Sequence, residues 1–219
     1  MRLFYACRDL QSRHYIPGFI IQKNCNLKSH FNSTQMAFKY SVKDPNDIYF
    51  ITSSIVQWID IFTKPVYQEV IIDALNYCSK AKGLHIHAWC LMTNHIHLLA
   101  SVEHERPSLP DIMRDFKKFT SKKIIEAIQL NNERRKDWLL NKFEYAGKYN
   151  PKIKDYKVWQ DGYHPVACFS KDFLFQKLDY IHNNPVKAGL VWAPQYYALS
   201  SAIDYAERRK GKVDVLLIE

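Results

Sequence analysis

The spacing of apolar residues predicts a strand followed by a helix in residues 47–83. Residues 47–56 are rich in Ile, Tyr, Phe, Thr and Val and follow an Asp-Pro-Asn turn, which is typical of a strand. A helix is expected from Thr63 as its N-cap, with Pro65 in the first turn and Gly83 as its stop. Its apolar positions recur at helical spacing, so this helix should bury one face.

The next segment contains the tripeptide His-Ile-His twice: the first histidine pair is His85 and His87, and the second histidine pair is His95 and His97. Residues 84–91 and 95–102 predict the two strands of a β-hairpin. Histidines two positions apart on a strand lie on the same face. Each pair is therefore a candidate metal site, and the alternative is an ordinary strand surface.

The turn of this hairpin decides where each pair points. With a two-residue loop at Thr93-Asn94, the second histidine pair lies opposite Met92 and Cys90 and shares their face. The first histidine pair is then expected on the other face. A change of one residue in the loop would reverse this arrangement, so a four-histidine site stays open.

The second half of the chain predicts further helices. Ser108 and Asp111 form a capping box that starts a helix reaching to about residue 131, and a basic, tyrosine-rich connection follows to about residue 156. A third helix is expected over residues 171–182, stopped by Asn183-Asn184-Pro185. The end contains a possible helix, 200–209, and a short apolar tail, 213–218.

This order of elements predicts an α+β fold. We expect a ferredoxin-like antiparallel sheet with helices on one face, plus a helical C-terminal extension. Residues 1–35 have scattered aromatic residues and no clear period, so we expect a poorly structured extension or a misplaced start codon before Met36. Residues 36–205 would form the main domain and residues 206–219 a tail.

The composition narrows the partners and the compartment. The net charge of +9 favours a polyanion such as nucleic acid, against the alternative of a merely basic surface. The five cysteines form no CxxC pair, which indicates a reducing compartment. No apolar run approaches the roughly 18 residues of a membrane span, so we expect a cytoplasmic protein without a membrane partner.

The second histidine pair has the better surroundings for chemistry. It follows a turn directly, where a ligand has access, and Leu98 and Leu99 anchor its strand in the core. Two imidazoles leave coordination positions open for a phosphate oxygen and water. We therefore expect His95 and His97 to be the metal-ligating residues.

Two segments resemble a known family. Residues 89–99, Trp-Cys-Leu-Met-Thr-Asn-His-Ile-His-Leu-Leu, resemble the signature of the HUH single-tyrosine transposases (histidine, bulky hydrophobe, histidine), and among them the REP-associated tyrosine transposases most closely. Residues 180–191, Tyr-Ile-His-Asn-Asn-Pro-Val-Lys-Ala-Gly-Leu-Val, resemble the family's C-terminal block. The first motif alone has low specificity, whereas both in this order are specific. The resemblance covers about residues 36–205.

The resemblance implies a reaction and its requirements. A helix tyrosine attacks a phosphodiester of hairpin-forming single-stranded DNA, which leaves a 5′-phosphotyrosine and a free 3′-hydroxyl. The second histidine pair and a third polar ligand, one turn after the tyrosine, would hold Mg²⁺ or Mn²⁺, and the metal would polarise the scissile phosphate. The resemblance also implies a homodimer.

The chain departs from this pattern in the helix of residues 108–131. The nucleophile's position falls on Phe119, which has no hydroxyl, and the third ligand's position falls on Lys123. On a helical wheel both positions join the apolar stripe, with Lys123 as its only charge. Lys123 could snorkel from the edge of the stripe, contact a DNA phosphate or pair with a carboxylate.

Three explanations of these departures stay open. The protein could bind DNA without cleaving it, or activate water for cleavage while the second histidine pair still holds metal. A tyrosine from elsewhere could also serve as nucleophile, and the chemically suitable ones are Tyr145, Tyr149, Tyr156 and Tyr180.

The candidate DNA-binding residues belong to two segments. Lys117, Lys118, Lys122 and Lys123 belong to the helix of residues 108–131, where the alternative reading is a solvated helix face. Asn183 and Asn184 belong to the C-terminal block, where they would contact DNA or cap a helix end before proline.

Overall fold

The computed structural model describes residues 42, 47–103, 107–148, 150, 153, 155–207 and 210–219. The expected extension over residues 1–35 lies outside this part of the chain. The described helices and strands are β1 (Tyr49–Ser54), η1 (Val56–Trp58), α1 (Pro65–Lys82), β2 (Leu84–Leu91), β3 (His95–Val102), α2 (Leu109–Leu130), α3 (Lys136–Gly147), β4 (Val166–Ala167), α4 (Lys171–Lys187), η2 (Pro194–Tyr196) and α5 (Ala202–Glu207). None of these helices is long and apolar enough to cross a membrane.

The four strands form one antiparallel sheet in the order β2-β3-β1-β4. This is the strand order of a ferredoxin-like fold, so the predicted fold class is confirmed. β4 has only two residues, but the chain before it also follows the free edge of β1. The backbone N–H of Gln160 donates to the Ser54 carbonyl at 2.8 Å, and that of Thr52 donates to the Tyr163 carbonyl at 3.0 Å.

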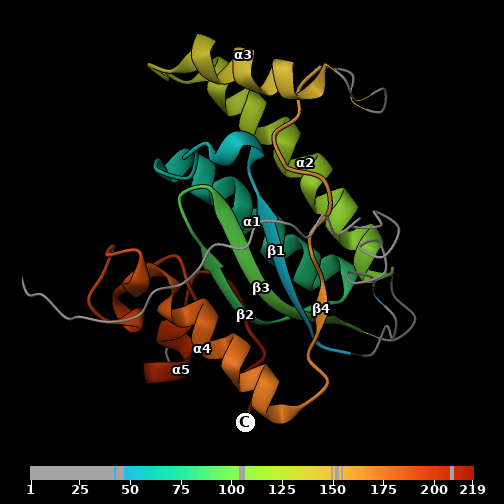
Figure 1. Ribbon diagram of the computed structural model, residues 1–219, viewed down its shortest axis with the longest axis vertical. Coiled ribbons are helices and arrows are strands. Elements are labelled where there is room, and N and C mark those ends of the chain that lie inside the picture. The colour runs from blue at the N-terminus through green and yellow to red at the C-terminus, as the bar shows by residue number, and fades with distance from the viewer. Residues whose placement is uncertain are drawn as a thin grey trace, which may run out of the picture. The chain divides into compact units, whose positions relative to one another are not determined.

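Helices cover both faces of the sheet (Figure 1). α1 and α2 pack on one face, where Ile51, Trp89, Ile96 and Leu98 belong to the larger hydrophobic core. α4, the predicted C-terminal extension, packs on the opposite face over a smaller cluster centred on Cys90 and Leu99, to which it contributes Leu178 and Ile181. The second face is therefore a thin layer between the sheet and one helix.

The hairpin has the predicted two-residue loop. Cys90 pairs with His97, and the backbone N–H of Met92 donates to the His95 carbonyl at 2.8 Å. The second histidine pair therefore lies on the face of Cys90, which is the α4 face.

The expected position of the first histidine pair is wrong. A β-bulge between Ile86 and Ala88 leaves His87 without a partner position on β3, and the extra residue reverses the alternation along β2. Ile86 joins the core under α1, whereas the His87 imidazole Nε2 lies 2.9 Å from Ser101 Oγ and its Nδ1 lies 3.1 Å from the Leu216 carbonyl. These bonds make His87 a buried structural residue and do not extend the candidate metal site.

The third predicted helix is longer than expected. We expected Asn183-Asn184-Pro185 to stop it, but α4 continues to Lys187 with Pro185 inside it. A proline in a helix interior costs about 3 kcal/mol. Leu178, Ile181 and Pro185 are all buried, so packing of this face offsets the cost. The helix ends where Gly189 adopts φ of 69°, a conformation that favours glycine.

Three further differences concern helix boundaries. The N-cap of α1 is Lys64, one residue after the expected Thr63, whereas Gly83 ends the helix in the left-handed conformation as expected. Residues 136–147 form α3 within the segment predicted as a connection, and they bury Leu139 and Phe143. The final expected helix is only six residues long, and the tail after it has no regular element, although Val213 is fully buried.

Candidate functional site

β3 presents the second histidine pair toward α4. The two imidazole rings are 4.7 Å apart between centroids, at an interplanar angle of 76°. On the neighbouring strand β1, Thr52 lies opposite His97 and Ser54 lies opposite His95. The two histidines thus occupy the middle of the sheet, at the end of β3 that follows the hairpin turn.

Hydrogen bonds fix both rings in the same sense. The His95 Nδ1 atom lies 2.7 Å from the Asn94 carbonyl oxygen Oδ1, which only accepts, so Nδ1 carries the hydrogen. The His97 Nδ1 atom lies 2.8 Å from Thr52 Oγ1, and its Nε2 accepts from the Asn184 amide at 3.2 Å. Both Nε2 atoms therefore carry the lone pair, as metal-binding histidines with a hydrogen-bonded second nitrogen do.

The environment keeps these imidazoles neutral at physiological pH. Burial lowers the pKa of His97 to about 3, with smaller contributions from His95 and the Lys177 ammonium. Burial also lowers the pKa of His95, while the Asp60 carboxylate acts in the opposite direction. A neutral imidazole is the form that ligates a metal, so these shifts favour ligation.

Aromatic rings enclose the second histidine pair. Phe50 stacks on His97 at 5.5 Å, and Tyr180 of α4 contacts the same imidazole edge-on at 5.3 Å. Trp58 contacts His95 edge-on at 5.9 Å, and it is more than half exposed. Exposed aromatic rings beside a metal pair are suited to stacking on unpaired bases.

α4 also contributes cations to this region. The Lys177 ammonium lies 4.9 Å from the Phe50 ring centroid and 5.7 Å from that of Tyr180, and the Lys187 ammonium lies 5.6 Å from the Tyr180 centroid. A hollow of about 430 Å³ is lined by Gln176, Lys177, Asp179, Tyr180, Asn183 and Lys187. A phosphate group in this hollow would meet two lysines beside the second histidine pair.

The residues present fit a divalent ion with an open coordination sphere. Two Nε2 lone pairs are available, and Asn184 brings an amide to His97 from a different element. Within the described part of the chain no group of three His, Cys, Asp or Glu side chains could hold a metal. The donor set therefore suits an ion that takes its remaining ligands from substrate and water, unlike a closed structural site.

The two key positions of α2 do not reach this site. Phe119 is half exposed, and among the described residues no hydrogen bond or ring contact joins it to the second histidine pair. Lys123 is also exposed and pairs with Glu126 at 2.8 Å, which is one of the expected alternatives. The buried face of α2 instead passes through Phe116, Thr120 and Ile124, so the expected apolar stripe was misplaced at its C-terminal end.

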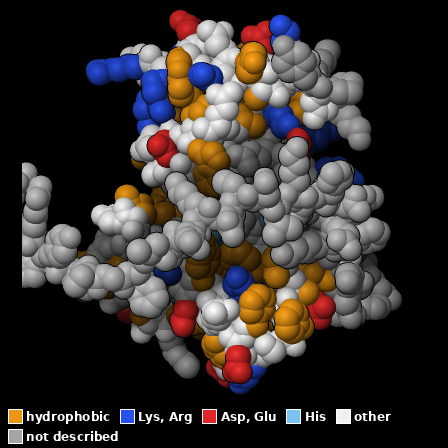
Figure 2. Space-filling view, in the orientation of Figure 1, with side chains coloured by type: hydrophobic (Ala, Val, Ile, Leu, Met, Phe, Trp, Pro, Cys, Tyr) orange, Lys and Arg blue, Asp and Glu red, His pale blue; other side chains and the backbone are white. Residues whose placement is uncertain are grey.

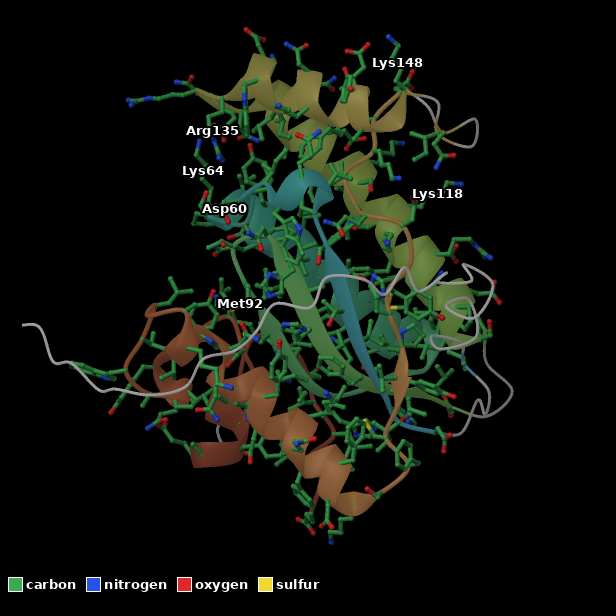
Figure 3. The ribbon with its side chains drawn as sticks, in the orientation of Figure 1. Asp60, Lys64, Met92, Lys118, Arg135 and Lys148 are labelled. Carbon is green, nitrogen blue, oxygen red and sulfur yellow. The ribbon has the colours of Figure 1, made fainter. Side chains whose placement is uncertain are left out.

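The predicted DNA-binding lysines differ in their freedom. The Lys117 ammonium donates to the backbone carbonyls of Gln160 and Gly162, and burial lowers its pKa to about 8. Lys117 therefore fastens α2 to the chain that follows β1. Lys118 and Lys122 are exposed, and Lys118 points outward from α2 (Figure 3).

Other predicted contact residues lie on α3 and α4. Figure 2 shows several Lys and Arg side chains over the end of the molecule that α3 forms. Asn183 lines the hollow beside α4, and its side-chain amide donates to the Asp179 carbonyl at 2.9 Å. Among the alternative nucleophiles, Tyr180 is in contact with the second histidine pair, and Tyr149 lies outside the described residues.

Sequence reasoning missed several neighbours of the second histidine pair. Thr52 was not singled out because a threonine in a strand is ordinary, and only the pairing of β1 with β3 brings it to His97. Lys177 and Lys187 could have been found, because they flank Tyr180 and Asn184 at helical spacing on one face.

Comparisons with known proteins point to one family. A family model described as "Transposase IS200 like" matches residues 56–184, more than half of the chain. A solved structure described as a REP-associated tyrosine transposase bound to a REP hairpin has a similar fold, with a TM-score of 0.50 and 18% sequence identity over 80% of this chain and 90% of that chain. No curated protein matches. The match over residues 56–184 shows that this chain belongs to the IS200-like transposase family.

Proposed function

We propose that this protein binds hairpin-forming single-stranded DNA and cleaves it with the help of a divalent metal ion. The observation that carries the proposal is the second histidine pair, whose Nδ1 atoms are held by Asn94 and Thr52 so that both Nε2 atoms are ready to ligate. The hairpin DNA in the similar solved structure supports the substrate class. The net charge of +9 supports a DNA partner as well.

His95 and His97 would hold Mg²⁺ or Mn²⁺, and Asn184 is our choice for the third protein ligand. An amide side chain carries an oxygen as well as a nitrogen, and that of Asn184 already lies 3.2 Å from His97 Nε2. The bound ion would supply Lewis-acid polarisation of the scissile phosphate. The chain itself orients the imidazoles, excludes water with Phe50 and offers the cations Lys177 and Lys187 to the DNA backbone.

Lys118 and Lys122, which are exposed on α2, and Asn183 beside α4 would contact the DNA. We further infer that the protein acts as a homodimer in the cytoplasm, where its DNA substrate is found. Light scattering of the purified protein, alone and with hairpin DNA, would measure the oligomeric state.

His97→Ala is expected to weaken Mn²⁺ binding by about tenfold or more, because it removes one of two imidazole ligands. His85→Ala is the matched control, since it changes the other His-Ile-His tripeptide and should leave the affinity for Mn²⁺ unchanged. Titration calorimetry with Mn²⁺ on the DNA-free proteins measures both. Equal affinities in wild type and His97→Ala would contradict the proposed metal site.

Binding of a hairpin strand should exceed binding of an unstructured strand of the same length. Fluorescence anisotropy with both labelled strands, at one fixed salt concentration, tests the substrate class because nonspecific contacts depend strongly on salt. Equal affinities for the two strands would contradict a hairpin substrate.

The alternative function is a DNA-binding protein that has lost cleavage. Phe119 favours it, because the helix that carries the nucleophile in the resemblance has no hydroxyl there. Incubation of a labelled hairpin strand with the protein and Mn²⁺ separates the two functions: strand cleavage supports the first, and binding without cleavage supports the second.

A further inference from the structure

We propose that Tyr180 of α4 is the nucleophile that Phe119 of α2 cannot be. The inference rests on the proposed function and deepens it, because it assigns the covalent step to a named residue. Its starting point is position: the Tyr180 ring touches the His97 imidazole at 5.3 Å between centroids, whereas Phe119 has no such contact among the described residues.

The Tyr180 hydroxyl is free to react. The side chain is 39% exposed, and no hydrogen bond to its hydroxyl occurs within the described chain. Other tyrosines nearby have structural bonds: the Tyr197 hydroxyl donates to the Leu91 carbonyl, and that of Tyr205 donates to the His87 carbonyl, both at 2.9 Å. A tyrosine kept only for packing would be expected to bury or bond its hydroxyl in the same way.

The rest of α4 supports the same reaction. Tyr180 and Asn184 are one helical turn apart, and both contact His97, so they share the face that meets the candidate metal site. The ammonium groups of Lys177 and Lys187 lie 5.7 and 5.6 Å from the Tyr180 ring. These cations would attract a DNA phosphate into the hollow beside the hydroxyl and stabilise the charge that develops on it.

The covalent step balances without an oxidant, a reductant or a further reactant. The Tyr180 oxygen forms a bond to phosphorus as the bond from phosphorus to the 3′ oxygen breaks. The phenolic proton passes to solvent, and the departing 3′ oxygen takes a proton from solvent. The products are a 5′-phosphotyrosine on α4 and a free 3′-hydroxyl.

The experiment compares wild type with Tyr180→Phe, which removes only the hydroxyl and keeps the ring. Wild type incubated with a labelled hairpin strand and Mn²⁺ should form a covalent adduct, and peptide mass spectrometry should place it in the tryptic peptide of residues 178–187, which contains one tyrosine. Tyr180→Phe should lose the adduct and reduce cleavage by about 100-fold or more. Its affinities for hairpin DNA and for Mn²⁺ should be unchanged.

Two controls make the result specific. Tyr196→Phe removes the hydroxyl of another exposed tyrosine and should keep the adduct. Phe119→Tyr combined with Tyr180→Phe should not restore it, because that position of α2 does not reach the second histidine pair.

Three results would overturn the role of Tyr180: an adduct that persists in Tyr180→Phe, cleavage by wild type without an adduct, or binding of hairpin and Mn²⁺ by wild type without cleavage. A wild-type protein that binds neither hairpin DNA nor Mn²⁺ would instead contradict the proposed function. The failure of one proposal is thus distinguishable from that of the other.

Discussion

Glu133→Gln is expected to lower the free energy of unfolding by about 3 kcal/mol. The Glu133 side chain is 2% exposed and accepts hydrogen bonds from Lys64 at 2.8 Å, the Tyr67 hydroxyl at 3.0 Å and the Arg135 backbone N–H at 3.0 Å. Removing one partner of a buried ion pair costs about 3–5 kcal/mol, and we expect the lower end because Lys64 is partly exposed and can turn to water. Urea denaturation at neutral pH measures the difference.

The matched control for this change is Glu126→Gln. Glu126 also pairs with lysines, Lys122 and Lys123, but on the exposed surface of α2. Surface pairs contribute about 0–1 kcal/mol, so the control should stay within that range. If both variants lost the same stability, Glu133 would not be the buried junction between α1 and the start of α3 that Figure 3 shows around Lys64 and Arg135.

The same carboxylate predicts a dependence of stability on pH. Burial alone would raise the pKa of Glu133, but hydrogen bonds from Lys64, the Arg135 backbone and Tyr67 outweigh it and lower the pKa from 4.5 to about 2. The unfolded state then binds the proton first, so this stability is present above about pH 4.5 and is lost as the pH falls toward 2. The gap between wild type and Glu133→Gln should therefore close by about 3 kcal/mol over this interval. A gap that stays constant down to pH 2 would contradict the lowered pKa.

Local signals in the sequence were sufficient for the hairpin that carries the second histidine pair. The loop at Thr93-Asn94 fixes which β2 residue lies opposite each histidine, and loop length is visible in the sequence. Ser108, Asp111 and Gly83 likewise marked helix ends correctly, because capping depends on neighbouring residues alone.

Long-range packing explains what the sequence did not reveal. Nothing beside His87 in the sequence announces the bulge, which brings the imidazole to Ser101 and the Leu216 carbonyl. Pro185 is a helix stop by local rules, and only burial against the sheet carries α4 past it. Glu133 is one acidic residue among many until the fold encloses it with Lys64 and Tyr67.

The helix of the candidate site depends on the same kind of long-range contact. α4 carries Tyr180 and Asn184, and its imidazole of His182 lies 2.9 Å from Ser201 Oγ. Ser201 Oγ also accepts from the backbone N–H of Trp89 at 3.0 Å. This one hydroxyl therefore joins α4 to β2, which is the edge strand that the chain around Ser201 covers.

Ser201→Ala is accordingly expected to lower the free energy of unfolding by about 3 kcal/mol, because two buried polar groups, the Trp89 N–H and the His182 Nε2, each lose their partner. Ser53→Ala is the matched control: Ser53 is equally buried, but its hydroxyl has no hydrogen-bond partner among the described residues. Its loss should be close to neutral, or stabilising. Thermal and urea unfolding of both variants measure the contrast.

The position of α4 gives this prediction a functional side. If Ser201 holds the helix against the sheet, Ser201→Ala should also weaken Mn²⁺ binding, since Asn184 would no longer be held beside His97. Ser53→Ala should leave Mn²⁺ affinity unchanged, although Ser53 belongs to β1, next to the strand that bears the second histidine pair. Equal losses of stability in the two variants would contradict the assignment of the Ser201 hydroxyl as the link between α4 and β2. A destabilised Ser201→Ala with full Mn²⁺ affinity would show that the metal pair is positioned by the sheet alone.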